Sequence, residues 1–133
     1  MTTISDKELF EKAKQVRKLA HAPYSNYKVG AAILDNEGNV HIGCNVENAS
    51  YPEGNCAETS AIAAMIAGGG RRIVTIAVVG EPVVSGICTP CGGCRQRIHE
   101  FADADTRVLL MQADGQIAEY SDDGLLPASF SLL

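Results

Sequence analysis

The sequence contains no basic run longer than two residues, and its formal net charge is −5. Proteins that bind nucleic-acid phosphates usually carry a basic stripe. The charge balance therefore argues against a nucleic-acid partner and favours a small, neutral ligand. Low-complexity segments are also absent, and 46% of the residues are hydrophobic, which is typical of a folded globular protein.

Long apolar runs are absent too, since no stretch approaches the ~20 apolar residues that a membrane-spanning helix needs. The N-terminal segment is charged and amphipathic, with no apolar run ahead of a small-residue cleavage site. We therefore expect a cytoplasmic protein with no membrane partner. Five cysteines, an odd number without a signal peptide, argue for metal ligands or reactive thiols over a disulfide framework.

A length of 133 residues suits one domain, and a chain of this size buries roughly two thirds of its unfolded surface. We expect a single domain over residues 1–133. Ser5 and Glu8 have the spacing of a capping box, and apolar residues then recur at helical intervals, which predicts an amphipathic first helix. Turn-forming residues separate two strands over 28–34 and 40–45, which predicts an antiparallel hairpin.

An alanine-rich helix is expected over 59–67, where three glycines at 68–70 end it. The apolar, β-branched run over 73–79 is typical of a central strand covered on both faces. The remaining expected elements are a helix over 94–101, strands over 107–111 and 116–120, and a last helical turn over 121–126. This order predicts the α/β class: a three-layer α-β-α sandwich with one mixed five-stranded sheet.

Two segments combine the residue types of a metal site: Cys56-Ala57-Glu58 and Pro90-Cys91-Gly92-Gly93-Cys94. Both precede expected helices, whose N-termini favour thiolate over thiol through unpaired N–H groups and the macrodipole. In mid-helix a spacing of two residues would turn the carboxylate about 200° away from the first thiol, so that thiol is expected at the helix edge. Catalytic zinc sites supply three protein ligands and keep one tetrahedral position open for water. We therefore predict one Zn²⁺ per chain on the three thiols, with the carboxylate beside it.

Other interpretations of the cysteines stay open. Cys44 or Cys88 as a fourth ligand would close the site and make it a structural zinc module, although Glu58 would then have no role. We expect both to be small core or loop residues. Cys91 and Cys94 alone have the spacing of a redox dithiol, which would make the chain a thiol redox protein.

The remaining polar candidates have simpler interpretations. The three histidines have no metal-ligand spacing relative to one another or to the cysteines, and we expect them on the surface or in packing: His21, His41 and His99. Asp122 and Asp123 are interpreted as a solvated helix start.

The motif Cys-Ala-Glu at 56–58, followed by Pro-Cys-x-x-Cys-Arg-Gln at 90–96, resembles the zinc-dependent cytidine deaminases of the short type with all-cysteine ligands. The similarity covers nearly the whole chain. It implies the cytidine deaminase fold, a homotetramer, and hydrolytic deamination of cytidine and 2′-deoxycytidine to uridine and 2′-deoxyuridine in pyrimidine salvage. Blasticidin S deaminases carry the same two motifs and remain an alternative.

The resemblance also implies a role for each matching residue. Glu58 is the catalytic base and acid, which takes a proton from water and delivers it to ring nitrogen N3 and then to the departing amine. Tyr27, where the family usually has Phe, places an aromatic face against the pyrimidine. Asn45 and Glu47 match the pair that holds the ribose hydroxyls, and Ala57 contributes backbone contacts to the base.

Three further positions match residues that reach a neighbouring subunit's pocket in the family's tetramers: Ala49, Tyr51 and Phe130. One position departs from the family, since many all-cysteine members carry Arg after the catalytic Glu and this chain has Thr59. The surplus negative charge of three thiolates on a divalent ion must then be offset elsewhere. The expected source is Arg95, together with the two helix dipoles.

Overall fold

The computed structural model describes residues 3–80 and 88–132. Its elements in chain order are α1 (Asp6–Arg17), β1 (Gly30–Asp35), β2 (Val40–Cys44), the 3₁₀ turn η1 (Tyr51–Glu53), α2 (Ala57–Ala67), β3 (Ile73–Val79), α3 (Gly92–Glu100), β4 (Arg107–Met111), β5 (Ile117–Ser121) and α4 (Asp122–Leu125). Every element predicted with bounds is confirmed to within two residues at each end. The turn η1 was not predicted. No helix in the described part of the chain has the length and apolar character to cross a membrane.

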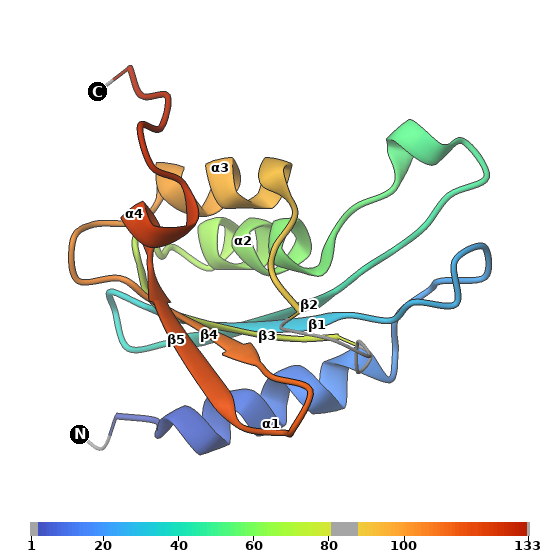
Figure 1. Cartoon of the computed structure of the whole chain (residues 1–133), viewed down its shortest axis with the longest axis horizontal. Helices are drawn as coiled ribbons and strands as arrows, with labels where there is room; N and C mark the ends of the chain where they lie inside the picture. The colour runs from blue at the N-terminus through green and yellow to red at the C-terminus, as the bar shows by residue number, and fades with distance from the viewer. Residues whose placement is uncertain (1–2, 81–87, 133) are drawn as a thin grey trace.

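The five strands form one mixed sheet in the order β2-β1-β3-β4-β5. β1 pairs antiparallel with β2 and with β3, and β4 pairs antiparallel with β5. β3 and β4 are parallel, because a crossover that contains α3 carries the chain back to the end of the sheet at which β3 begins. α1 covers one face of the sheet, and α2 and α3 lie on the other (Figure 1). The predicted three-layer α-β-α sandwich is confirmed.

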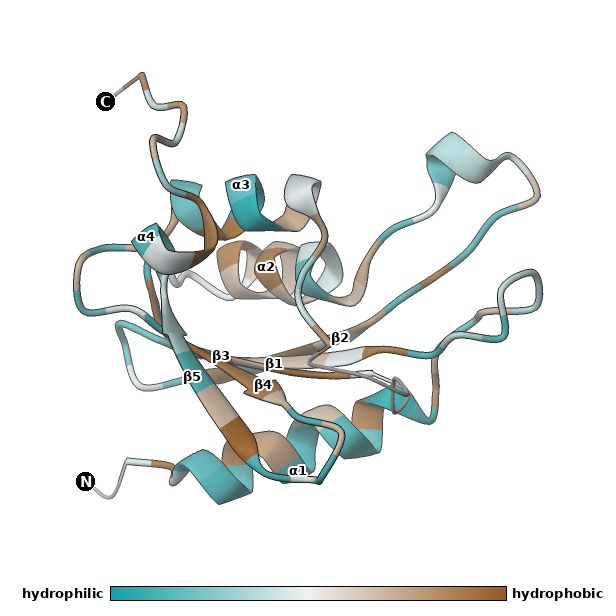
Figure 2. Ribbon diagram, in the orientation of Figure 1, coloured by the Kyte–Doolittle hydropathy of each residue, from teal (hydrophilic) through white to brown (hydrophobic). Residues whose placement is uncertain are grey.

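The apolar core occupies both faces of the sheet, and hydrophobic residues concentrate along its central strands (Figure 2). Side chains of a strand alternate between faces, so neighbouring residues of β1 belong to different clusters. Ala31 and Ile33 pack in the cluster beneath α2 and α3, whereas Ala32 packs against α1. All six residues of β1 are buried, as expected for a strand covered on both sides.

A glycine in β2 brings α2 close to the sheet. A Cβ added to Gly43 would lie 2.3 Å from the backbone nitrogen of Ala61 and 2.8 Å from the carbonyl oxygen of Ala57. The first turns of α2 therefore rest directly on the backbone of β2, with no room for a side chain between them. This close approach sets the position of the helix start that carries Cys56 and Glu58.

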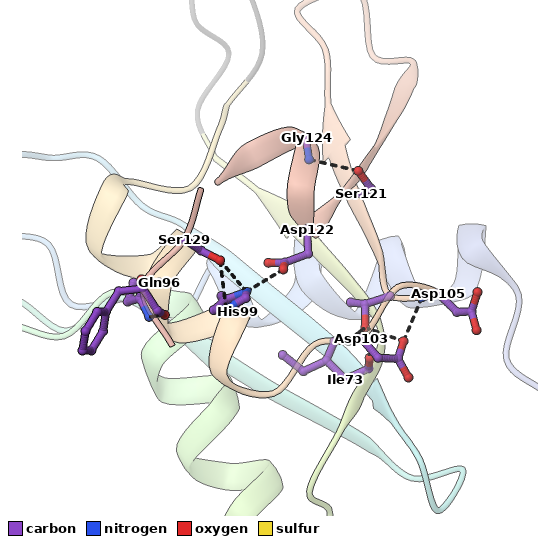
Figure 3. Close-up of polar contacts among 11 residues, drawn as sticks. Ile73, Gln96, His99, Asp103, Asp105, Ser121, Asp122, Gly124 and Ser129 are labelled. Atoms are coloured by element: carbon purple, nitrogen blue, oxygen red, sulfur yellow. Dashed lines mark hydrogen bonds and ion pairs between the residues drawn. The ribbon is translucent and has the colours of Figure 1, made fainter. Parts of the chain in front are cut away.

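The segment that follows α4 is held against α3 by side chains of that helix. Arg95 Nη1 donates to the Leu125 carbonyl at 2.9 Å, and Gln96 Nε2 donates to the Phe130 carbonyl at 3.0 Å. His99 lies between Asp122 and Ser129, with Nδ1 2.7 Å from Asp122 Oδ2 and Nε2 3.0 Å from Ser129 Oγ (Figure 3). We call these seven residues the C-terminal clamp.

The contacts of the C-terminal clamp show that one prediction, a solvated Asp122, was wrong. Asp122 does begin α4, but it is buried and bound to His99, so it is not solvated as expected. The trio of Ser, His and Asp also lacks the geometry of an activated nucleophile. Ser129 Oγ is 3.4 Å from Nδ1 and 3.0 Å from Nε2, so it lies beside the ring and not along the Nε2 lone pair, where a nucleophile must stand.

Candidate metal centre and adjoining pocket

The sulfur atoms of Cys56, Cys91 and Cys94 form a compact cluster in which all three lie within 4.8 Å of one another. Tetrahedral zinc with Zn–S bonds of ~2.3 Å needs sulfurs about 3.8 Å apart, so the cluster fits this ion with small adjustments. Among the residues that the structure describes, it is the only group of three or more potential ligands. Neither Cys44 nor Cys88 joins it, which weighs against the closed four-cysteine site.

Both helix starts contribute through their caps. Cys56 is the N-cap of α2, and Cys91 is the N-cap of α3. The Cys91 side chain accepts a hydrogen bond from the Cys94 backbone nitrogen at 3.4 Å. Cys56 is therefore at the helix edge, as predicted. An N-cap side chain faces the unpaired N–H groups of the first turn, where negative charge is stabilised.

The hydrogen bond between Cys56 and Cys94 lowers the pKa of the Cys56 thiol and raises the pKa of the Cys94 thiol. Because zinc takes thiolates as ligands, metal binding must displace the thiol protons. Zinc affinity at this cluster is consequently expected to fall at low pH.

Glu58 lies in the first turn of α2, two residues from Cys56, and is 4% exposed. Burial raises the pKa of its carboxyl group, because a charged carboxylate loses hydration there. The carboxyl group lines the pocket beside the cysteines but is not part of the metal-ligand cluster. This is the arrangement of a carboxylate available for proton transfer next to a metal.

A pocket of about 480 Å³ opens beside the cluster, a size typical of small-ligand sites. Its walls include the residues predicted to contact substrate, which come from three separate parts of the chain: Tyr27, Asn45, Glu47 and Ala57. Cys56, Glu58 and Cys91 line the same pocket. Ser25 and Cys88 also line this wall, and neither was predicted there.

Asn45 and Glu47 also organise the loop that forms one side of the pocket. The Asn45 amide accepts from the Val29 backbone nitrogen and donates to the Tyr27 carbonyl, both at 2.8 Å. Glu47 accepts from the backbone nitrogens of Tyr24 and Ser25 at 2.9 and 3.1 Å and from the Ser25 hydroxyl. The hydrogen bonds from Ser25 and Tyr24 lower the pKa of Glu47, so it is a carboxylate at neutral pH.

Tyr27 contacts a thiol through the hydroxyl group that distinguishes it from the usual Phe. Its Oη atom is 3.2 Å from Cys88 Sγ, and both residues line the pocket. Burial raises the pKa of Cys88, so this sulfur stays a thiol at neutral pH. Cys88 is therefore a pocket-wall residue, which agrees with its expected role as a bystander to the metal cluster.

The three positions assigned to a neighbouring subunit's pocket are all exposed on this chain. Tyr51 is 75% exposed and Phe130 is 68% exposed, and Ala49 lies on the same exposed loop as Tyr51. Tyr51 and Tyr24 stack edge to face, with ring centroids 5.9 Å apart, at a second cavity. None of the three lines the pocket beside the cysteines, and their role in a neighbour stays a prediction.

Two arginines follow Cys94, and they have different partners. Arg95 Nε donates to the Pro90 carbonyl and Nη1 to the Leu125 carbonyl, both at 2.9 Å. Arg97 Nη1 lies 3.7 Å from Cys94 Sγ, and Thr59 Oγ1 lies 3.8 Å from the same sulfur. The contact of Arg97 was missed, although a spacing of three residues on a helix is a signal for it. Charge compensation by Arg95 stays a prediction.

A mixed sheet between helices, with three thiols gathered at two helix starts beside a pocket, defines an α/β metalloprotein with a zinc site of catalytic type. The model of the cytidine and deoxycytidylate deaminase zinc-binding region matches residues 3–111. The chain belongs to this family.

Individual relatives agree with the family match. A cytidine deaminase of Halalkalibacterium halodurans is 44% identical over 126 residues, covering 92% of each chain. A cytidine deaminase of Sporosarcina psychrophila is 40% identical over 124 residues, covering 93% of this chain and 90% of the relative. The crystal structure of a cytidine deaminase from Burkholderia pseudomallei has a TM-score of 0.88 at 45% identity and covers 96% of this chain and 100% of the other.

Proposed function

We infer that the chain is a zinc-dependent enzyme that hydrolytically deaminates cytidine and 2′-deoxycytidine to uridine and 2′-deoxyuridine. The observation that carries this conclusion is a buried carboxyl group, Glu58, beside a cluster of three thiols, which is the number of ligands that a zinc ion with one open position needs. The relatives named cytidine deaminases span nearly the whole chain, which favours this substrate class.

The proposed chemistry needs a nucleophile and a proton carrier. Cys56, Cys91 and Cys94 would hold the zinc ion, which would lower the pKa of a water molecule to about 7 and so supply hydroxide at neutral pH. Glu58 takes the proton from the attacking water and delivers it to N3, which makes C4 electrophilic. Glu58 then takes the remaining proton of the hydroxyl group added at C4 and passes it to the amine, which leaves as ammonia while the water oxygen becomes the carbonyl oxygen. A raised pKa suits Glu58 for both transfers, because a proton carrier works best near the operating pH.

The pocket wall supplies the proposed contacts with the nucleoside. Tyr27 presents its ring to the pyrimidine, with its hydroxyl group anchored on Cys88. Asn45 and Glu47 receive the ribose hydroxyls, and the backbone of Ala57 contacts the base. An ionised Glu47 suits this role, since a carboxylate accepts hydrogen bonds from two hydroxyl groups.

The biological setting is part of the same proposal. We place the enzyme in pyrimidine salvage in the cytoplasm, as a single domain that assembles into a homotetramer. Ala49, Tyr51 and Phe130 would then enter a neighbouring copy's pocket, and their exposure on the isolated chain supports this assembly.

An ultraviolet assay for the loss of cytidine, run with and without a zinc chelator, tests the function. We expect turnover of cytidine and 2′-deoxycytidine, its loss after chelation and its return with added zinc. Cys91→Ala should lose both zinc and turnover, whereas Cys44→Ser, a thiol outside the cluster, should keep both. Faster turnover of blasticidin S than of cytidine would favour that alternative, and zinc binding without any turnover would leave only a structural zinc module.

A further inference from the structure

The proposed zinc site carries an unbalanced charge. Three thiolates give −3 and one zinc ion gives +2, so the cluster keeps a net charge of −1, with Glu58 buried close by. Negative charge in a partly buried site is costly unless a cation or hydrogen-bond donors stand near it. The position after Glu58 is the neutral Thr59, whose hydroxyl group lies near Cys94 Sγ but carries no charge.

One cation of α3 reaches the cluster. Arg97 Nη1 is 3.7 Å from Cys94 Sγ, so the guanidinium group folds back along the helix by three residues toward the helix start. Among the contacts between described residues, this is the only one from a Lys or Arg side chain to a cluster sulfur. Arg97 is otherwise on the exposed side of α3, where its side chain has room to adopt this position.

A glycine leaves the path of this side chain open. A Cβ added to Gly93 would lie 3.3 Å from Arg97 Nη1 and 3.9 Å from Cys91 Sγ. The guanidinium group therefore passes over the bare backbone of Gly93, at the side of the cluster where both cysteines of α3 lie. A side chain at this position would crowd the guanidinium group, which would have to shift.

Arg95 is less suited to the same task. Two of its three guanidinium nitrogens donate to the carbonyl groups of Pro90 and Leu125, which fixes the loop before Cys91 and the C-terminal clamp. These hydrogen bonds indicate that Arg95 positions the backbone. Arg97, by contrast, donates its described hydrogen bond to a sulfur atom of the cluster.

We propose that Arg97 is the residue that offsets the negative charge of the thiolate cluster and thereby sets its affinity for zinc. The guanidinium group is a permanent cation with donors that suit thiolate acceptors, and it needs no change of protonation to act. Groups around metal ligands typically change metal affinity 10–100-fold when they are removed. The proposal rests on the zinc site inferred above and is independent of which substrate the enzyme takes.

The test is the zinc dissociation constant of the metal-free, reduced protein, measured by competition with a chromophoric chelator and without any substrate. Arg97→Gln should weaken zinc binding by about 10-fold or more. Arg97→Lys restores the charge and should recover most of the loss. Arg72→Gln removes the same charge at an exposed pair with Asp103 and should leave zinc binding within twofold of the wild type.

Several outcomes would overturn the proposal. Zinc affinity of Arg97→Gln within twofold of the wild type would exclude Arg97, and equal losses in Arg97→Gln and Arg97→Lys would show that charge is not the cause. A loss in Arg95→Gln without one in Arg97→Gln would assign the charge compensation to Arg95. If Arg97→Gln binds zinc weakly while the wild type deaminates no cytidine, the inferred substrate fails and the role of Arg97 stands.

Discussion

Two carboxyl groups are buried almost equally in this protein, yet their environments are opposite. Glu58 is 4% exposed and Asp35 is 2% exposed. Burial raises the pKa of Glu58. Burial would also raise the pKa of Asp35, but hydrogen bonds from His41 and from the backbone nitrogens of Asn39 and Glu37 outweigh it and lower the pKa.

Glu58 is the proposed proton carrier, whereas Asp35 stabilises the fold. Asp35 closes the hairpin between β1 and β2, where its Oδ2 atom is 2.7 Å from His41 Nε2. Its proton affinity is low because several donors stabilise the charged form. The hydrogen bonds of Glu58, with its own backbone nitrogen and with Cys94, do not outweigh burial, so the pKa of its carboxyl group stays raised. Burial alone does not distinguish the two, whereas the supply of hydrogen-bond donors does.

The largest effect is expected on turnover, when Glu58 is replaced. Glu58→Gln keeps the shape of the side chain but removes the proton carrier, so kcat for cytidine should fall by about 10²–10⁴-fold or more. Zinc content, measured by atomic absorption, should stay at one ion per chain. Substantial residual turnover in the zinc-loaded variant would remove Glu58 from its role.

Asp35→Ala should produce the reverse pattern. Removal of the buried carboxylate leaves His41 and two backbone N–H groups without their acceptor, and we expect a loss of about 3–5 kcal/mol in the free energy of unfolding. The fraction that remains folded should keep its kcat. Urea unfolding and assays on the same samples measure both quantities, and a stable variant with low kcat would contradict the assignment of Asp35 to structure.

His99→Ala tests the C-terminal clamp with a smaller effect. The change leaves Asp122 buried without its 2.7 Å partner, so the free energy of unfolding should fall by about 1–3 kcal/mol. Amide hydrogen exchange should speed up over residues 125–130 and not in β1. Unchanged exchange in that segment would show that the clamp does not hold it.

The smallest expected effect is the pH dependence of Asp35. Its folded pKa lies below its unfolded value of about 3.9, so the carboxylate adds stability above that pH and loses it as the pH falls through the folded pKa. Wild type and Asp35→Asn should therefore differ most in the free energy of unfolding near neutral pH and converge in acid. A gap that stays constant from pH 7 to pH 3 would contradict the lowered pKa.

Much of the fold could be predicted because the signals are local. The apolar run of β3 and the Ser5 cap of α1 are short-range patterns, and both elements were predicted. The turn η1 is a single 3₁₀ turn with Pro52 in its first positions, too short to leave a periodic signal. Motif spacing was equally sufficient for Cys56, Cys91 and Cys94, since the chemistry of zinc restricts the ligand types and the helix starts restrict their placement.

By itself, the sequence determined the helices and strands and the two motifs that carry the three thiols and the carboxylate, because each of these consists of residues close together in the chain. Only the tertiary structure decided which long-range partners meet. Asp122 is buried on His99, Cys88 lies against Tyr27, and Arg95 donates to the Leu125 carbonyl. These contacts depend on how the sheet and helices pack, which no local pattern encodes. They determine which hydrogen-bond partners a buried polar or charged group has, and therefore its protonation state.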